Sequence, residues 1–197
     1  MASATRVPAE VSTIEESTFD TPSRPICRAG PGKMGPMGNQ RASIGLTDDE
    51  VDVLLRAART LVLVTNGPDG VPDPVPMWFV VDEGGTVWMR TYAKSQKVVN
   101  LTRDPRFAAL VETGDRYVEL RGAQLSGTVA LVDDVDTICE VFAGLMVKYE
   151  GLDPEHVGAV TTAYRDRATK QRALRLDVTR VVSWDHGKQA AASGAAG

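Results

Sequence analysis

The segment from Thr86 to Glu112 constrains the fold more than any other part of the chain, because its periodicity changes twice. The apolar run Val87–Met89 is followed by a polar stretch and a short helical pattern, which Asp104-Pro105 ends. A second apolar run begins at Phe107. We therefore predict a strand, a short helix and another strand in direct succession.

The start of the predicted helix has the composition of an anion site. Ser95 can act as the N-cap, because its hydroxyl can accept hydrogen bonds from free amides of the first turn. Those amides, the helix dipole, Lys94 and Lys97 together form a cradle for an anion. One interpretation is a site for the phosphate of a cofactor, and the other is a solvated helix start that carries lysines. Helix N-termini bind anions in general, so these residues alone leave both interpretations open.

The chain before this segment predicts one helix and a β-meander. Thr47 and Glu50 have the spacing of a capping box, and an apolar helical face follows them. Leu61–Thr65 and Val75–Asp82 are predicted strands, separated by a cluster of turn residues. Three prolines near the entry of the second strand lack ladder donors, so we expect an edge strand or a distorted one there.

The chain after Phe107 predicts more strands and two helices. The predicted elements are strands over Phe107–Thr113 and Tyr117–Val132, helices over Asp133–Glu150 and from Asp153, and a last strand over Arg172–Trp184. Gly122 and Gly127 lie in the long strand and permit the bulge that closes a barrel. Cys139 falls on the apolar face of a helix, so we expect it to be buried rather than reactive.

Composition limits the class of protein. At 197 residues the chain is long enough for one domain with a full core, and its net charge of −4 disfavours a nucleic-acid partner. The cysteines and histidines have no metal-ligand spacing, so we expect no metal, and His156 has no partner ligand in the sequence. No run of about 18 apolar residues occurs, and the N-terminus lacks the apolar core of a secretory signal. We therefore expect no membrane association and a cytoplasmic location.

The composition divides the chain into three parts. Residues 1–45 are rich in Pro, Gly, Ser and Thr without any period, and we expect a mostly disordered extension that folding does not need. Within it Gly30–Gly35 fits GxGxxG formally, but no strand precedes it and two prolines interrupt it. Residues 46–188 form the predicted domain, and residues 189–197 are a predicted disordered tail.

The sequence carries no familiar catalytic motif of its own. It has no GxSxG, HExxH or Walker A pattern. This fits an enzyme whose reactive atoms belong to a cofactor, with the protein providing position and electrostatics. It fits a binding protein equally well.

The order of motifs in the central segment resembles that of the split β-barrel flavin and deazaflavin oxidoreductases. The matching features are a strand that ends near Thr91-Tyr92, then Ser95-Gln96-Lys97, Asn100-Leu101 and Arg103–Arg106 before the next strand. This group includes pyridoxamine 5′-phosphate oxidase and the coenzyme F420-dependent reductases. The resemblance extends over residues 46–187. It implies a mainly β (α+β) fold, a six-stranded antiparallel split β-barrel of the FMN-binding type with flanking helices, and a homodimer with two interface sites.

The resemblance also implies a set of cofactor-binding residues. The residues expected to bind the phosphate are Lys97 and Ser95, helped by Lys94 and Gln96. Those expected along the tricyclic ring are Val75, Pro76, Met77 and Trp78, and those expected to contact the ring or the ribityl chain are Arg90, Thr91 and Tyr92. Trp184 is expected to reach the partner subunit's site. Trp78 is explained about as well as a core residue, because aromatic side chains are frequently buried.

Coenzyme F420 is the first expectation for the cofactor, and FMN is the alternative. The Arg103–Arg106 turn and the C-terminal Val181–Asp185 look like the deazaflavin branch, and the Arg-x-His pattern of the oxidase branch is not present. We expect reduced F420 to pass hydride to a small electron-poor acceptor, namely an enone, a quinone or a tetrapyrrole. The proton is expected to come from solvent or from a nearby tyrosine such as Tyr92 or Tyr117. The alternatives are an FMN-dependent oxidase-like enzyme and a non-catalytic protein that binds flavin, deazaflavin or haem.

Overall fold

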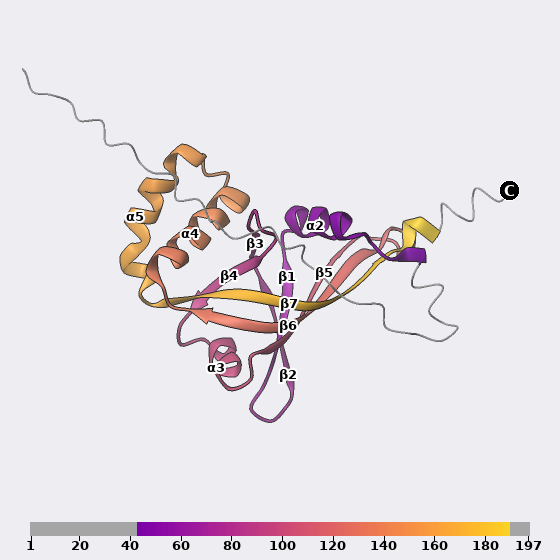
Figure 1. Ribbon diagram of the computed structural model, residues 1–197, viewed down its shortest axis with the longest axis horizontal. Coiled ribbons are helices and arrows are strands. Elements are labelled where there is room, and N and C mark those ends of the chain that lie inside the picture. Colours follow the sequence, from indigo (N-terminus) through magenta and orange to yellow (C-terminus); the bar gives the residue numbers. More distant parts are fainter. Residues whose placement is uncertain (1–42, 190–197) are drawn as a thin grey trace, which may run out of the picture.

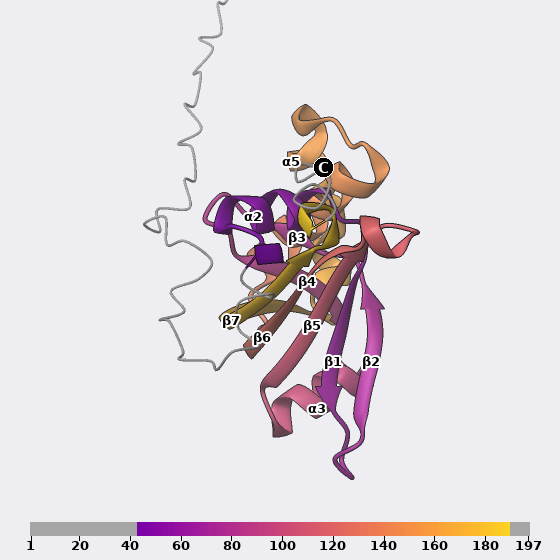
Figure 2. The ribbon, with the colours of Figure 1, turned by 90° about the vertical axis from the view of Figure 1, so that its right-hand side faces the viewer.

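The computed structural model describes residues 43–189, and its centre is one antiparallel sheet of seven strands. The strands, which Figure 1 labels, lie in the order β2-β1-β5-β6-β7-β4-β3, and Figure 2 shows β7, β6, β5, β1 and β2 side by side. The strands are β1 (Leu61–Asn66), β2 (Pro72–Met77), β3 (Val80–Val81), β4 (Val87–Tyr92), β5 (Arg106–Thr113), β6 (Arg121–Val132) and β7 (Gln171–Asp185). The predicted strand, helix and strand are β4, α3 (Gln96–Arg103) and β5.

The two edge strands of the sheet, β2 and β3, follow each other in the chain. Trp78 and Phe79 alone separate Met77 at the end of β2 from Val80 at the start of β3. Three residue steps span at most about 11 Å. The edges of a flat seven-stranded sheet would lie about 29 Å apart, since strands are about 4.8 Å apart. The sheet must therefore curl until its edges approach each other, which gives the split barrel that the family resemblance implied.

The sheet has seven strands rather than six because Val75–Asp82 is not a single strand. β2 pairs with β1 at one edge of the sheet, whereas β3 pairs with β4 at the other edge. The chain leaves one ladder and joins the other at Trp78 and Phe79, so no continuous ladder can run through them. The proline-rich β2 is an edge strand, as expected from its missing amide donors.

Tyr149 holds the crossing between the two edges. Its hydroxyl accepts a hydrogen bond from the Phe79 amide and donates one to the Phe79 carbonyl, each 3.1 Å long. Its ring stacks on Trp78, with centroids 4.3 Å apart and planes 5° from parallel. Phe79 is fully buried, so a side chain satisfies the two backbone groups that a neighbouring strand would otherwise satisfy. Burial raises the pKa of the Tyr149 phenol, which keeps its donor proton in place.

Helices cover parts of the sheet and enclose two cores. Figure 1 shows α2 (Asp48–Ala57) along one side, and α4 (Val135–Leu145) and α5 (Val157–Ala168) together at the end where β4 and β7 pair. The main core joins α2 to the sheet through buried side chains that include Leu54, Leu55, Leu61, Phe79, Met89, Leu125 and Leu174. A smaller core fills the space around α4 and α5, with Ile138, Cys139, Tyr149 and Tyr164.

Several local predictions are confirmed. Thr47 and Glu50 form the capping box, with hydrogen bonds of 2.8 and 3.2 Å between each side chain and the other's amide. Cys139 is buried on α4, and burial raises the pKa of its thiol, which disfavours the reactive thiolate. The register of the β6–β7 ladder shifts at Ser126/Gly127, where a bulge was expected. A side chain at Gly127 would collide with the Asp177 carbonyl, so the bulge needs glycine.

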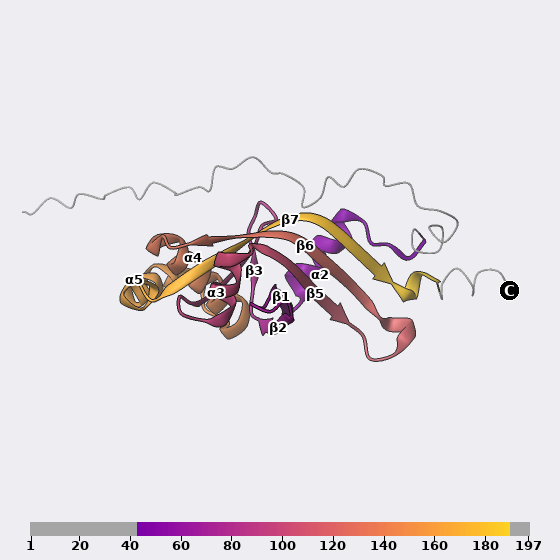
Figure 3. The same cartoon turned by 90° about the horizontal axis from the view of Figure 1, so that it is seen from below.

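Two predicted boundaries are wrong. The strand expected from Tyr117 begins at Arg121, because Tyr117–Glu119 forms a turn of 3-10 helix that the Glu119 side chain supports through the Arg116 amide. The helix expected through Glu150 is α-helical only to Leu145 and continues as a π-helical stretch over Met146–Glu150. Figure 3 shows the long curve of β6 and β7 that extends away from this helical end.

Part of the predicted organisation lies outside the described residues. Residues 1–42 and 190–197 include nearly all of the expected extension and tail, the GxGxxG-like segment and Cys27. Residues 43–45 precede the predicted domain and are described, and the Gly45 carbonyl accepts a 2.9 Å hydrogen bond from Lys188 Nζ. Within residues 43–189, no helix is long and apolar enough to cross a membrane.

We predict that Tyr149→Phe lowers the free energy of unfolding by about 1–3 kcal/mol, because it leaves two buried backbone groups without their partner but keeps the stacked ring. Urea denaturation measures this change. Tyr117→Phe is the matched control, because Tyr117 is 70% exposed and makes a ring contact only with His186 among the described residues. Equal stability of the two variants would show that the crossing does not depend on the Tyr149 hydroxyl.

Candidate functional site

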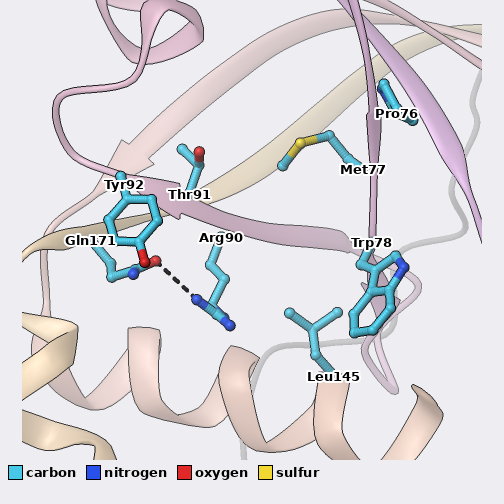
Figure 4. A pocket seen from close by; sticks show the side chains of 8 residues that line it. All are labelled: Pro76, Met77, Trp78, Arg90, Thr91, Tyr92, Leu145 and Gln171. Carbon is cyan, nitrogen blue, oxygen red and sulfur yellow. Dashed lines mark hydrogen bonds between the residues drawn. The ribbon is translucent and has the colours of Figure 1, made fainter. Parts of the chain in front are cut away.

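A cavity of about 330 Å³ lies beside the crossing, and we call it the Trp78 cavity (Figure 4). Its lining consists of Pro76, Met77, Trp78, Arg90, Thr91, Tyr92, Leu145 and Gln171. These residues come from the end of β2, the crossing that follows it, the end of β4, the start of β7 and the last turn of α4. The cavity therefore exists only because the sheet curls and α4 closes over its end. Six of the seven residues that the sequence assigned to the ring and ribityl chain line it.

Arg90 is held rigidly at the wall of this cavity. Its Nη1 donates hydrogen bonds to the Tyr164 hydroxyl at 2.8 Å and to Gln171 Oε1 at 3.0 Å (Figure 4 shows the second). Its guanidinium carbon lies 4.8 Å from the Phe142 ring centroid and 5.2 Å from that of Tyr164, within cation–π range. Burial raises the pKa of the Tyr164 phenol, so this acceptor stays a neutral hydroxyl.

The opposite side of the cavity has a different character. Met77, Leu145 and the indole of Trp78 supply apolar surface, and Trp78 is 47% exposed although its ring stacks on Tyr149. Tyr92 stands at the rim and is 69% exposed. The cavity thus combines an apolar wall with a polar edge of a guanidinium, an amide and a hydroxyl, the composition of pockets that orient a flat ligand.

A second cavity, of about 450 Å³, begins next to the first, and we call it the Lys97 cavity. Its lining consists of Gly67, Pro68, Asp69, Val71, Pro72, Asp73, Val75, Gln96, Lys97 and Asn100. Lys97 Nζ donates a 3.3 Å hydrogen bond to Thr91 Oγ1, which belongs to the lining of the Trp78 cavity. Val75 and Pro76 are consecutive on β2 and line one cavity each. The two cavities are therefore neighbours along β2 and at the β4–α3 junction.

The helix start differs from the prediction in one respect. Ser95 occupies the N-cap position of α3, but its hydroxyl accepts no bond from a first-turn amide and instead accepts one from Thr91 at 3.3 Å. The Ser95 carbonyl caps the turn by accepting from the Val98 and Val99 amides. Within residues 43–189, the backbone amides of Gln96 and Lys97 have no hydrogen-bond acceptor, so they are left to other acceptors. Lys94 is exposed and lines neither cavity.

Two acidic residues share the lining of the Lys97 cavity with Lys97. Asp69 and Asp73 line the same cavity. The Asp73 carboxylate accepts a 3.1 Å hydrogen bond from Asn100, whose amide also donates to Thr65 at 3.0 Å. Gln96 in turn donates to Asn100 Oδ1 at 3.0 Å. An anion in this cavity is therefore favoured near Lys97 and disfavoured near the carboxylates of Asp69 and Asp73, the second of which reaches α3.

Trp184 lies far from both cavities of its own chain. It pairs with Gly122 near the end of β7, and its indole packs so closely on that glycine that a side chain there would collide with it. Thirteen residue steps separate Gln171 from Trp184, roughly 40 Å along an extended strand. Its predicted role in a partner subunit's site stays a prediction.

Sequence reasoning missed several lining residues. Gln171 stands opposite Tyr92 in the β4–β7 register, just before the segment predicted as the last strand. Leu145 was interpreted as part of a helix core, and Asn100 and Asp73 had no visible role. Gln171 could have been found only from the pairing of the last strand with β4. That register places Gln171 opposite Tyr92, and opposite residues on neighbouring strands share a surface.

Other titratable groups lie outside the two cavities. Lys148 Nζ lies 3.9 Å from the Phe79 ring centroid, and burial, together with Arg59 and Arg56, lowers its pKa to about 8. Asp153, Glu155 and His156 bring their ligand atoms within 4.8 Å of one another, but all three are exposed. Exposed groups of this kind are common without a metal, and we assign them no role.

The comparison with known proteins identifies the family. Residues 47–185 match the pyridoxamine 5′-phosphate oxidase family, which is most of the chain. A conserved hypothetical protein, Rv2991 from Mycobacterium tuberculosis, is 35% identical in sequence, with a TM-score of 0.68 over 76% of this chain and 91% of that one. The fold and both cavities therefore belong to a split-barrel protein of the flavin and deazaflavin class. The chain is a member of the pyridoxamine 5′-phosphate oxidase family.

More distant structures share the fold alone. An F420 reductase is 22% identical, with a TM-score of 0.51 over 66% of this chain and 94% of that one. HutZ, the haem storage protein from Vibrio cholerae, is 14% identical, with a TM-score of 0.53 over 71% of this chain and 96% of that one. No curated protein sequence matches the chain.

We predict that Lys97→Ala weakens cofactor binding by about 1.5–3 kcal/mol, or roughly tenfold to a hundredfold in Kd, because it removes a charge-assisted hydrogen bond. Quenching of cofactor fluorescence during titration measures the Kd. Lys94→Ala is the matched control, since it also removes a lysine charge. Lys94 lies three residues before Lys97, is exposed and lines neither cavity. Equal losses in the two variants would point to general electrostatic attraction rather than to a contact at Lys97.

Proposed function

We propose that this protein is an oxidoreductase that binds coenzyme F420 and reduces a small electron-poor acceptor, namely an enone, a quinone or a tetrapyrrole. The observation that carries the proposal is the hydrogen bond between Lys97 and Thr91, which places a cation next to an aromatic-walled cavity. A ligand with a flat ring and a phosphate at a short distance from it fits this arrangement. Among split-barrel proteins such ligands are the flavins and deazaflavins.

The residues present fit such a ligand. The Trp78 cavity lies within the range of about 300–1,000 Å³ that ligand pockets have, and Met77 and Leu145 give it an apolar wall. The Lys97 ammonium and the backbone amides of Gln96 and Lys97 provide donors for a phosphate. Asp69 and Asp73 line the same cavity, so a phosphate is favoured close to Lys97 and away from these two carboxylates.

F420 is favoured over FMN by the sequence pattern rather than by the fold. The fold is shared with an F420 reductase and with a haem storage protein, so the architecture alone accommodates different cofactors. The C-terminal residues from Val181 to Asp185 look like the deazaflavin branch, and the oxidase branch's Arg-x-His pattern is missing. FMN is the second candidate for the same two cavities.

The chain's own contribution to the reaction is position rather than acid–base chemistry. Reduced F420, when bound, supplies the hydride and its two electrons, and the acceptor takes up one proton as well. Among the residues that line the Trp78 cavity, Tyr92 alone has a side chain that can give a proton to an acceptor near neutral pH. It is 69% exposed, so solvent reaches the same place. Trp78 and Arg90, both fixed by neighbours, restrict how a flat acceptor can lie, and such orientation lowers the barrier.

We also propose that the protein is a homodimer. Leu110 lies on β5 between β1 and β6, yet it is 38% exposed, so the described chain leaves this part of the sheet uncovered. A second copy is the simplest cover for such a surface. In this arrangement Trp184 of one subunit approaches the cavities of the other.

We expect Tyr92→Phe to keep at least about a tenth of the wild-type rate, because solvent can replace a proton donor at an exposed position, whereas an essential general acid contributes about 10²–10⁴-fold. We expect Trp78→Ala to lose more, because it removes a wall of the cavity. The assay is oxidation of reduced F420 against a panel of quinones and activated enones. Melting temperatures identify any loss that reflects unfolding of Trp78→Ala.

Two results would contradict this mechanism. A hundredfold loss in Tyr92→Phe with unchanged F420 affinity would identify a dedicated proton donor. Tight F420 binding without turnover of any acceptor would favour a non-catalytic carrier over an enzyme.

A further inference from the structure

The Arg90 guanidinium carries a positive charge that no carboxylate balances. It forms no ion pair within residues 43–189, although seven other arginines and lysines of this region do. Its acceptors, the Tyr164 hydroxyl and the Gln171 amide oxygen, are neutral. Its Nε is buried and has no hydrogen-bond partner. Partly burying an unpaired charge costs free energy, so a site that keeps one uses it or balances it with a bound anion.

The free edge of this guanidinium faces the Trp78 cavity. Nη1 is occupied by its two acceptors and Nε is buried, whereas Nη2 has no partner among the described residues and is not a buried atom. Arg90 lines the cavity, and Figure 4 shows its guanidinium between Gln171 and Leu145. The Phe142 and Tyr164 rings and the two hydrogen bonds fix its plane, so it is already ordered for a ligand.

The rest of the cavity cannot provide a counter-charge. Met77, Trp78 and Leu145 are apolar, and Thr91, Tyr92 and Gln171 are neutral. The acidic residues Asp69 and Asp73 line the other cavity. A carboxylate matches the geometry of a guanidinium and binds it through short charge-assisted hydrogen bonds.

We propose that Arg90 is a specificity-determining residue that binds a carboxylate on the acceptor, so the acceptor class is a planar unsaturated molecule that carries an acid group. The assignment of the bound acid as a hydride acceptor rests on the proposed function. The carboxylate subsite itself follows from the geometry of Arg90 alone. The ring of a cofactor also carries electron-rich oxygens that could use Nη2, and the experiment separates the two sources.

The experiment measures binding, not turnover. Cinnamate and cinnamamide are planar, unsaturated and nearly the same shape, and they differ in charge. Each is titrated calorimetrically into the full-length protein, with and without saturating F420, and F420 is titrated separately into every variant. The variants are Arg90→Met, Arg90→Lys and the control Arg175→Met, which removes the same charge from β7 at a surface ion pair with Asp177.

The wild-type protein and Arg175→Met are expected to bind cinnamate about tenfold to a hundredfold more tightly than cinnamamide, the usual worth of a charge-assisted hydrogen bond. Arg90→Met is expected to lose this preference, and Arg90→Lys to keep a part of it. If Arg90→Met does not fold, the test uses the wild-type protein and Arg90→Lys. The inference then requires that the wild-type protein prefers cinnamate to cinnamamide and that Arg90→Lys keeps only a part of this preference.

Three outcomes would overturn the inference. The first is a wild-type protein that does not prefer the acid, and the second is a preference that survives Arg90→Met. The third is a loss of F420 affinity in Arg90→Met as large as the loss for cinnamate, together with competition between the two ligands, which would assign Nη2 to the cofactor ring. Failure of the proposed function looks different: the wild-type protein does not bind F420, while the preference for cinnamate and its dependence on Arg90 remain.

Discussion

The rest of the structure depends on the two hydrogen bonds between the Tyr149 hydroxyl and the backbone of Phe79. The chain has two residues in which to pass from one edge of a seven-stranded sheet to the other, and it does so through a fully buried residue. Without a ladder partner, Phe79 needs another donor and acceptor, and Tyr149 supplies both from the end of the helical region. The curl of the sheet and the docking of α4 are thus tied together at one residue.

The same crossing builds the candidate site. Met77 and Trp78 line the cavity because β2 ends there, and Leu145 lines it because the helix that carries Tyr149 must lie close by. The end of β4 then contributes Arg90, Thr91 and Tyr92 in succession, and α3 brings Lys97 against Thr91. Stability of the fold and shape of the cavity therefore rest on the same contacts, and Trp78 serves both as a stacking partner and as a wall.

The sequence predicted those parts of the fold that local chemistry determines. The Thr47–Glu50 capping box, the strand, helix and strand around Lys97, and the buried Cys139 each follow from residues within a few positions of one another. The family resemblance then pointed to six residues that line the Trp78 cavity. The break at Trp78 and Phe79 was not predictable in this way, because its cause is a partner 70 positions away. Gln171 and Leu145 were missed for the same reason. Ser95 occupies the predicted N-cap position, but its hydroxyl bonds to Thr91 rather than to its own helix.

The central claim is that the two neighbouring cavities hold a deazaflavin. Its most direct test is the absorption spectrum of the protein purified from its native host, followed by mass spectrometry of the chromophore released on denaturation. We predict the spectrum of a deazaflavin and a released molecule with the mass of F420. A haem spectrum, or a released molecule with the mass of FMN, would contradict the claim.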